Sequence, residues 1–270
     1  MDEAQLPQLL EDVKEVVKAA GREVMQHQGS PDGSWEKGKD DPVTLADLAS
    51  DKLLRERLLA LCPECGWQSE ETVDDQSRLD KEWVWVVDPL DGTKEFLHQT
   101  PEFTVSVGLV HNGVPKLGVV FNPATMEMFA GAEGTPVTYM GTEAGVSGER
   151  FRAAASIAVS ASEYKRGEFD EVAATMHLRP IGSVAYKLAL VAAGQVDVFY
   201  TLTPRCEWDI CAGVYLVQAA GGHATEKDGS QVVFNKPEGK TRSLVAANPE
   251  LHADLLEALA DVPLAPDLRA

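Results

Sequence analysis

The segment WVWVVDPLDGTKEFL, residues 83 to 97, contains two aspartates three positions apart, directly after five apolar residues. The apolar run predicts a buried strand, which would deliver Asp88 and Asp91 to the edge of a sheet within one turn. Two unpaired carboxylates at this spacing repel each other, so one would tend to take up a proton. A hard divalent cation removes that conflict, and oxygen ligands without His or Cys favour Mg²⁺. The alternative is that both acids only cap a helix and accept turn hydrogen bonds.

The residues around the two aspartates suit the binding of a phosphate group. Pro89 fixes its own φ and removes a hydrogen-bond donor, and Gly92 lets the backbone approach a ligand closely. Thr93 can cap the helix that we expect to follow. Free backbone N–H groups at a helix start bind phosphate oxygens. The motif therefore combines cation ligands with an anion-binding helix start.

Two further acidic segments could complete such a site. WQSEETVDD places Glu70 and Glu71 after a short apolar run, and CEWDICAG places Asp209 at the start of a predicted helix, where the dipole favours a carboxylate. Taken singly, an adjacent Glu pair is often a solvated face and an Asp at a helix start is often a cap. Taken together they matter more, because metal-assisted hydrolysis of a phosphate ester needs several oxygen ligands and a residue that orients water.

The composition is that of an ordinary globular protein with a strong acidic bias. The chain has 270 residues, 44% of them apolar, and its 43 acidic against 24 basic residues give a formal charge of −19. Such a surface field repels nucleic acid and anionic membranes, so we expect no nucleic-acid partner. An anionic substrate would need a local reversal of that field, which bound divalent cations supply.

The N-terminal segment and the apolar runs are not typical of a signal peptide or a membrane span. The acidic, amphipathic start MDEAQLPQLLEDVKEVVKAAG lacks the basic residues and continuous apolar run of a signal peptide. No run approaches the roughly 18 apolar residues of a membrane span. We therefore expect a cytoplasmic protein without an integral membrane segment.

Four cysteines occur in two groups. Cys62 and Cys65 have half the spacing of a zinc site, but no second Cys or His pair accompanies them, so free thiols in a reducing compartment are favoured over structural zinc. Cys206 and Cys211 are expected to be small buried residues.

Periodicity predicts an α/β protein with two halves. Residues 3–28 and a segment from Thr44, whose Thr44 and Asp47 resemble a capping box, are expected to be helices. Strands are expected at 83–87, 103–110, 116–121, 127–132 and 136–140, with an Asn-Gly hairpin joining the second and third. After a Gly-rich stretch at 141–150 the pattern alternates, with strands at 153–160, 196–200 and 243–248 and helices at 168–176, 183–194, 208–222 and 249–260. We expect an α+β half at residues 1–148 and an α/β half at 149–270.

DPLDGTKEF, followed far downstream by WDICAGVYLVQAAGG, closely resembles the inositol monophosphatase superfamily of Mg²⁺-dependent, lithium-sensitive phosphatases. The KEF tail is most similar to the 3'(2'),5'-bisphosphate nucleotidase branch, the CysQ-type enzymes. The resemblance extends from DPVTLADLASD, at residues 41–51, to LVAANPEL, at residues 244–251. It implies a layered αβαβα sandwich, phosphomonoesterase activity and two or three Mg²⁺ ions.

The resemblance also implies a role for individual residues, all of the family's residue types. Glu70, Asp88, Asp91 and Asp209, with the Leu90 carbonyl, match the metal ligands. Thr93 matches the residue that orients the attacking water with Glu70, and Asp47 matches the acid that pairs with this threonine. The backbone N–H groups of Gly92 and Thr93 match those that hold the phosphate. The substrate side of the site would consist of Lys94, Gly182, Ser183, Lys187, Arg205 and Glu207, the last two at the rim of the pocket.

The substrate implied by the resemblance is adenosine 3',5'-bisphosphate, which would give AMP and phosphate. The nucleotidase branch usually carries a basic SRSH-like segment where this chain has VSASEY, although Lys165 and Arg166 follow closely. The alternative is inositol monophosphate or another small sugar phosphate. For Lys187 by itself, the alternative interpretation is a solvated helix position. A non-catalytic phosphate or metal sensor is the alternative of another class. A homodimer is compatible with the resemblance, since dimers are frequent in the family.

Overall fold

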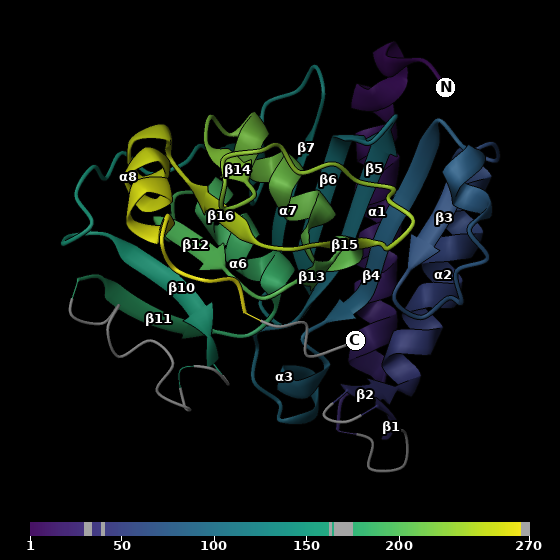
Figure 1. The fold of residues 1–270 in the computed structure, drawn as a ribbon. Coiled ribbons are helices and arrows are strands. Elements are labelled where there is room, and N and C mark those ends of the chain that lie inside the picture. Colours follow the sequence, from purple (N-terminus) through teal and green to yellow (C-terminus); the bar gives the residue numbers. More distant parts are fainter. Residues whose placement is uncertain (30–33, 39–40, 162–163, 165–174, 266–270) are drawn as a thin grey trace.

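The computed structural model describes residues 1–29, 34–38, 41–161, 164 and 175–265 of the chain. In this part of the chain, helices and two sheets alternate in five layers (Figure 1). Helices α1 and α2 cover one face of a seven-stranded sheet, and α6 and α7 lie between this sheet and a five-stranded one. Helix α8 packs on the outer side of the smaller sheet. The predicted layered α/β sandwich is confirmed.

The two N-terminal helices form where the sequence predicts them. After a short turn η1 (Glu3–Gln5), α1 spans Leu6–Gln26, and its buried residues recur at the helical spacing. Helix α2 spans Leu45–Leu61 and begins with the predicted capping box, in which the Asp47 carboxylate accepts the N–H of Thr44 at 2.8 Å. This cap fixes the first turn of α2.

The seven-stranded sheet has the order β3-β4-β5-β6-β7-β8-β9. Strands β3 and β4 are parallel and the other neighbours antiparallel. Every residue of β4 is buried because helices cover both faces of the sheet. The hairpin between β5 and β6 turns at Asn112 and Gly113, both with positive φ, as predicted. The strands are β3 (Gly66–Ser69), β4 (Trp83–Asp91), β5 (Thr104–His111), β6 (Val114–Asn122), β7 (Glu127–Ala132), β8 (Thr138–Tyr139) and β9 (Thr142–Glu143).

The five-stranded sheet has the order β11-β10-β12-β16-β14. Its three predicted strands are present, whereas β11 and β14 were not expected. The predicted helix at 168–176 lies mostly outside the described residues. The strands are β10 (Ser156–Ser160), β11 (His177–Ile181), β12 (Val198–Thr201), β14 (His223–Thr225) and β16 (Leu244–Ala247), and the helices are α6 (Val184–Ala192), α7 (Glu207–Ala219) and α8 (Pro249–Leu259).

Smaller elements connect the layers. They are the strand pairs β1 (Ser34–Gly38) with β2 (Asp41–Thr44) and β13 (Arg205–Cys206) with β15 (Lys240–Thr241), the turn η2 (Ser77–Asp80), and the short helix α3 (Thr93–Leu97). One buried apolar cluster joins residues of both large sheets, among them Val84 and Phe129 of the larger and Ala158 and Phe199 of the smaller. The predicted boundary between residues 148 and 149 would separate the two large sheets. This division into two halves stays a prediction. Among the described residues, none of the helices has the length and apolar character that a membrane crossing requires.

The expectation of free thiols at Cys62 and Cys65 is wrong, because the structure joins them in a disulfide. Helix α2 ends at Leu61, and the Cys65 N–H donates to the carbonyl of Cys62 in the turn that follows. That turn brings the two Cα atoms to 5.5 Å, within the usual range for a disulfide. Cys206 and Cys211 are buried, as expected, and do not belong to this disulfide.

A buried histidine should make the stability of the fold depend on pH. His252 of α8 is 6% exposed and its Nε2 lies 2.9 Å from the Thr225 hydroxyl. Burial, with a smaller effect of His223, lowers the pKa of His252 to about 4. Unfolding restores an ordinary pKa of about 6.5, so the unfolded chain binds more protons between these values and the free energy of unfolding falls as the pH is lowered through this window. The full loss is about 3 kcal/mol.

Urea unfolding of the wild type and His252→Gln between pH 7.5 and 4 measures this effect. The glutamine variant should lose less stability than the wild type over the window, because it cannot take up the proton. Parallel curves for the two proteins would show that His252 is not protonated on unfolding.

Candidate active site

A cleft of about 180 Å³ lies where the ends of the two large sheets meet the first turns of α3, α6 and α7. Both halves of the chain contribute to its walls. Most of the predicted site residues line it: Glu70, Asp88, Leu90, Asp91, Gly92, Thr93, Lys94, Gly182, Ser183, Lys187, Arg205 and Asp209. The structure therefore brings together segments that are up to about 140 residues apart in the sequence.

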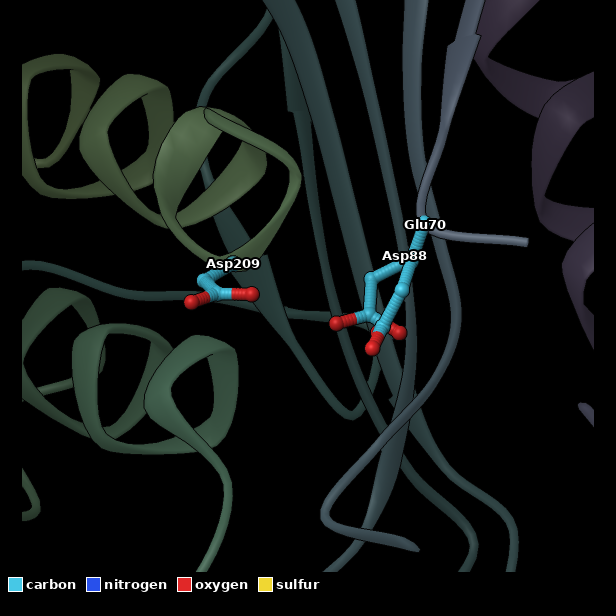
Figure 2. A group of neighbouring side chains, drawn as sticks. All are labelled: Glu70, Asp88 and Asp209. Carbon is cyan, nitrogen blue, oxygen red and sulfur yellow. The ribbon is translucent and has the colours of Figure 1, made fainter. Parts of the chain in front are cut away.

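Three carboxylates converge in this cleft. Oxygen atoms of Glu70, Asp88 and Asp209 all lie within 4.8 Å of one another. Glu70 directly follows β3, Asp88 lies near the end of the parallel strand β4, and Asp209 is in the first turn of α7. Figure 2 shows Glu70 beside Asp88, with Asp209 facing them from α7. Parallel pairing of β3 with β4 explains why the first two acids meet at one edge of the sheet.

The carboxylate cluster needs a positive charge. Burial, together with the negative charges of Glu70, Asp91 and Asp209, raises the pKa of Asp88 well above its usual range. Without a cation the cluster therefore favours a proton on Asp88. A bound divalent cation would replace that proton and remove the repulsion. Three converging carboxylates with no nitrogen or sulfur ligand among them fit a hard cation such as Mg²⁺.

Asp91 lines the same cleft but is held by the second half of the chain. Its Oδ2 accepts hydrogen bonds from the Ser183 hydroxyl at 2.7 Å and from the N–H of Ala185 at 2.6 Å. Ser183 has a positive φ of 52°, and its hydroxyl also lies 3.1 Å from that of Thr104. Ser183 lines the cleft, its hydroxyl donates to Asp91, and its predicted place on the substrate side of the site stays a prediction.

The irregular end of β4, between Asp88 and Asp91, is held by its own hydrogen bonds. The N–H of Leu90 donates to Asp88 Oδ1 at 3.0 Å, and the Thr93 hydroxyl lies 3.1 Å from the Leu90 carbonyl oxygen. Gly92, at φ 97°, is the N-cap of the five-residue helix α3, so the expectation that Thr93 caps this helix is wrong. Only glycine adopts such a φ without strain, and this moves the cap back by one residue.

Asp47 and Thr93 form the pair that the sequence predicts. The Thr93 hydroxyl lies 3.0 Å from Asp47 Oδ1, while Asp47 Oδ2 accepts both the N–H and the hydroxyl of Thr44. Burial raises the pKa of the Asp47 carboxyl, and the hydrogen bonds from Thr44 and Thr93 oppose this effect. The capping box of α2 thus holds the buried Asp47 carboxylate against the segment that contains Asp88 and Asp91.

Three cationic side chains are also among the residues that line the cleft: Lys94, Lys187 and Arg205. Lys94 is exposed, and Lys187 is only 3% exposed. The Lys187 ammonium donates to the carbonyl of Ile181 at 3.1 Å and lies 5.6 Å from the centre of the Phe199 ring. Lys187 is therefore not the solvated helix residue of the alternative interpretation.

The predicted position of Glu207 at the rim of the pocket is wrong. Its side chain is fully buried, and its carboxylate accepts the N–H groups of Asn235 at 2.9 Å and Lys236 at 3.1 Å. Glu207 and Asp209 are both in the first turn of α7, and residues two apart on a helix face different sides. Since Asp209 faces the cleft, Glu207 faces the chain segment beside it.

Two acidic residues near the cleft were not among the site residues predicted from the sequence. Glu95 lines the cleft, and burial raises its pKa. Glu102 Oε2 accepts the N–H of Gly182 at 2.7 Å, and a Cβ at Gly182 would lie 2.3 Å from Glu95 Cγ. Glu95 could have been found, because it belongs to the KEF tail of the recognised motif, but nothing in the nearby sequence indicates the contact of Glu102 with Gly182, 80 residues away.

Lys165 and Arg166, which could substitute for the basic segment of the nucleotidase branch, lie outside the described residues.

The comparisons with known proteins agree with this geometry. The model of the inositol monophosphatase family matches residues 5–264. The chain belongs to this family. A 3'(2'),5'-bisphosphate nucleotidase CysQ of Salmonella typhimurium is 33% identical over 238 residues, covering 85% of this chain and 95% of its own. An inositol-1-monophosphatase of Synechocystis sp. is 32% identical over 266 residues, covering 94% of this chain and 89% of its own.

The solved structures place this family member in the same fold. The extragenic suppressor protein suhB from Bartonella henselae superposes with a TM-score of 0.82 at 29% identity, over 94% of this chain and 99% of its own. The predicted superfamily and its CysQ-like relation are confirmed. Because the relatives are named both as inositol monophosphatases and as nucleotidases, family membership indicates a phosphoric monoester hydrolase but leaves its substrate open.

Proposed function

We propose that the protein is a Mg²⁺-dependent phosphomonoesterase that converts adenosine 3',5'-bisphosphate into AMP and phosphate. The observation that carries this proposal is one cleft with two kinds of charge. The acids Glu70, Asp88 and Asp209 converge in it, and the cations Lys187 and Arg205 also line it. A small ester with two phosphate groups would suit both kinds of charge, because one group would meet the metal ligands and the other the cations.

Each acidic residue has a task in this proposal. Glu70, Asp88 and Asp209, with Asp91 and the Leu90 carbonyl, would hold the cations. Bound Mg²⁺ would supply electrophilic stabilisation of the phosphoryl oxygens and lower the pKa of water. Asp91 brings one oxygen to this task, since its Oδ2 is already held by α6.

Asp47, Thr93 and Glu70 would prepare the attacking water. With the Thr93 proton directed to Asp47 or to the Leu90 carbonyl, the hydroxyl oxygen can accept a hydrogen bond from water. Glu70 accepts a hydrogen bond from the second O–H of the water, which keeps its proton, and so aligns the oxygen with phosphorus. The new P–O bond forms as the ester P–O bond breaks, and the alkoxide that leaves takes up a proton from a solvent water. Buried Asp47, with its raised pKa, is suited to receive the water proton through Thr93.

The alternative substrate is an inositol monophosphate or another small sugar phosphate. The inositol-1-monophosphatase relative matches a larger share of this chain than the nucleotidase does, at similar identity. A non-catalytic sensor is disfavoured, because a protein that only binds phosphate does not need the water-orienting pair of Glu70 and Thr93.

A phosphate-release panel tests the proposal. The purified protein is assayed with and without Mg²⁺ on adenosine 3',5'-bisphosphate, inositol 1-phosphate, fructose 1,6-bisphosphate and AMP. We expect Mg²⁺-dependent turnover with the highest kcat/KM on the bisphosphorylated nucleotide. Preference for inositol 1-phosphate would favour the sugar-phosphate alternative, and binding without turnover of any ester would favour the sensor.

Lys187→Met should separate the two substrate classes. Loss of a charged contact costs about 1.5–3 kcal/mol, so kcat/KM for adenosine 3',5'-bisphosphate should fall by about 10- to 100-fold. The value for inositol 1-phosphate should stay within about threefold, because this substrate has no second phosphate to contact the lysine. Lys52→Met, at an exposed position of α2, is the control. Equal losses on both substrates would remove Lys187 from the recognition of a second phosphate.

A further inference from the structure

One polar face of α2 contacts two separate segments of the site, residues 89–93 and residues 69–72. Asp47, Ser50 and Asp51 are at helical positions i, i+3 and i+4, which lie on the same side of a helix. Asp47 contacts Thr93, and the Ser50 hydroxyl donates to the carbonyl of Pro89 at 2.9 Å. The roles proposed above use only Asp47.

Asp51 contacts both flanks of Glu70. The Ser69 hydroxyl donates to Asp51 Oδ1 at 2.5 Å, and the Thr72 hydroxyl donates to Asp51 Oδ2 at 3.1 Å. Thr72 in turn accepts the indole N–H of Trp67 at 3.1 Å. The carboxylate thus ties the last residue of β3 to the loop that follows, with Glu70 between the two attachment points.

Glu70 needs such support because it lies just beyond the sheet. Strand β3 ends at Ser69, and the N–H of Glu70 donates to the carbonyl of Val87 in the adjacent strand. From Glu70 to Asp75 the chain is half-buried or exposed and has no regular secondary structure. Beyond that last ladder hydrogen bond, the two contacts to Asp51 restrain the backbone on each side of the Glu70 carboxylate.

We propose that Asp51 is a positioning residue that holds Glu70 in the geometry required to bind Mg²⁺ and to orient the attacking water. Ser50 supports the same frame by holding Pro89, the residue before the Leu90 carbonyl. The inference rests on the proposed function, since it assigns Asp51 to the same site. Asp51 acts through hydrogen bonds to Ser69 and Thr72, and not by contact with the metal or the substrate.

The test uses Asp51→Ala, Asp51→Asn and a control, Glu56→Ala, at an exposed position of the same helix. Partners that orient metal ligands typically account for 10- to 100-fold in metal affinity or activity, so Asp51→Ala should weaken Mg²⁺ binding by about tenfold or more. Calorimetric titration with Mg²⁺ alone measures this without substrate. In the assay, kcat should fall by a similar factor, with KM changed by less than about threefold.

Asp51→Asn distinguishes hydrogen bonding from charge. The amide oxygen can still accept the Ser69 hydroxyl, and the amide nitrogen can donate to Thr72, so most of the Mg²⁺ affinity and kcat should return. Thr72→Val removes one of the two attachments and should show a smaller fall than Asp51→Ala. This variant also keeps the test available should Asp51→Ala not fold.

Several results would overturn the inference. They are an Asp51→Ala protein with lower thermal stability but unchanged Mg²⁺ affinity and kcat, an asparagine variant as impaired as alanine, and equal losses in Glu56→Ala. Failure of the proposed function is recognised separately. A wild type that hydrolyses none of the panel esters would refute the phosphatase assignment, while the Mg²⁺ titrations would still decide whether Asp51 positions Glu70.

Discussion

Replacing Asp88 by asparagine is expected to abolish nearly all phosphatase turnover and, in the absence of metal, to make the protein more stable. Ligands of a catalytic cation contribute several kcal/mol of transition-state stabilisation, so kcat should fall by about a thousandfold or more. The gain in stability has an electrostatic cause. Burial and three neighbouring acids raise the pKa of Asp88, so folding without a cation requires either the uptake of a proton or the burial of an unpaired charge, and both oppose folding at neutral pH.

Phosphate release and thermal unfolding, each with Mg²⁺ and with EDTA, measure the two effects. In EDTA the asparagine variant should unfold at a higher Tm than the wild type, and saturating Mg²⁺ should reduce or reverse this difference. Asp12→Asn, at an exposed position of α1, should change neither quantity. Activity close to wild type in Asp88→Asn would remove this residue from the metal site.

Gly92→Ala should be the most damaging substitution in the turn that follows Asp91. The glycine has φ 97°, and an added Cβ would lie 2.9 Å from the carbonyl oxygen of Glu102. A left-handed conformation costs a non-glycine residue about 1–2 kcal/mol, and crowding of this kind adds about 1–3 kcal/mol. Relief of that overlap would displace Asp91 and Thr93, and a shift of about 1 Å at a catalytic group can cost 100-fold in rate.

Gly113→Ala is the matched control. Gly113 has φ 82° in the β5–β6 hairpin, so alanine there meets a similar backbone penalty. Denaturant unfolding should show a loss of about 2–5 kcal/mol in Gly92→Ala and of about 1–2 kcal/mol in Gly113→Ala, whereas kcat should fall by about 100-fold only in Gly92→Ala. A Gly92→Ala enzyme with normal kcat would show that the turn tolerates displacement and does not hold the phosphate site.

The elements with a strong local signal were predictable. Strand β4 follows from its apolar run, the start of α2 from the Thr44 and Asp47 capping box, and the β5–β6 hairpin from Asn112 and Gly113. These patterns depend on neighbours within a few residues. Strands β3, β11 and β14 were not predicted, since three to five residues carry too little periodicity and are defined by the strand beside them.

The cysteines and Glu207 show that the local sequence also fails to predict the contacts of some side chains. The spacing of Cys62 and Cys65 suggested free thiols or half of a zinc site, and neither holds, because the turn after α2 brings the two residues together in a disulfide. Glu207 and Asp209 are two residues apart in one motif, yet packing of α7 turned only Asp209 toward the cleft. A motif specifies residue types, whereas the orientation of the helix decides which of them reach the site.

The sequence by itself determined the chemistry available to this protein: oxygen ligands for a hard cation, a glycine turn, and an acid placed by a helix cap. Only the tertiary structure decided how these parts meet. Parallel pairing of β3 with β4 sets Glu70 beside Asp88, and packing of α7 against the sheet brings Asp209 to them across more than 100 residues. The start of α6 holds Asp91, and the polar face of α2 holds the flanks of Glu70. The physical reason is that these contacts arise from long-range packing of elements, which no local pattern of residues encodes.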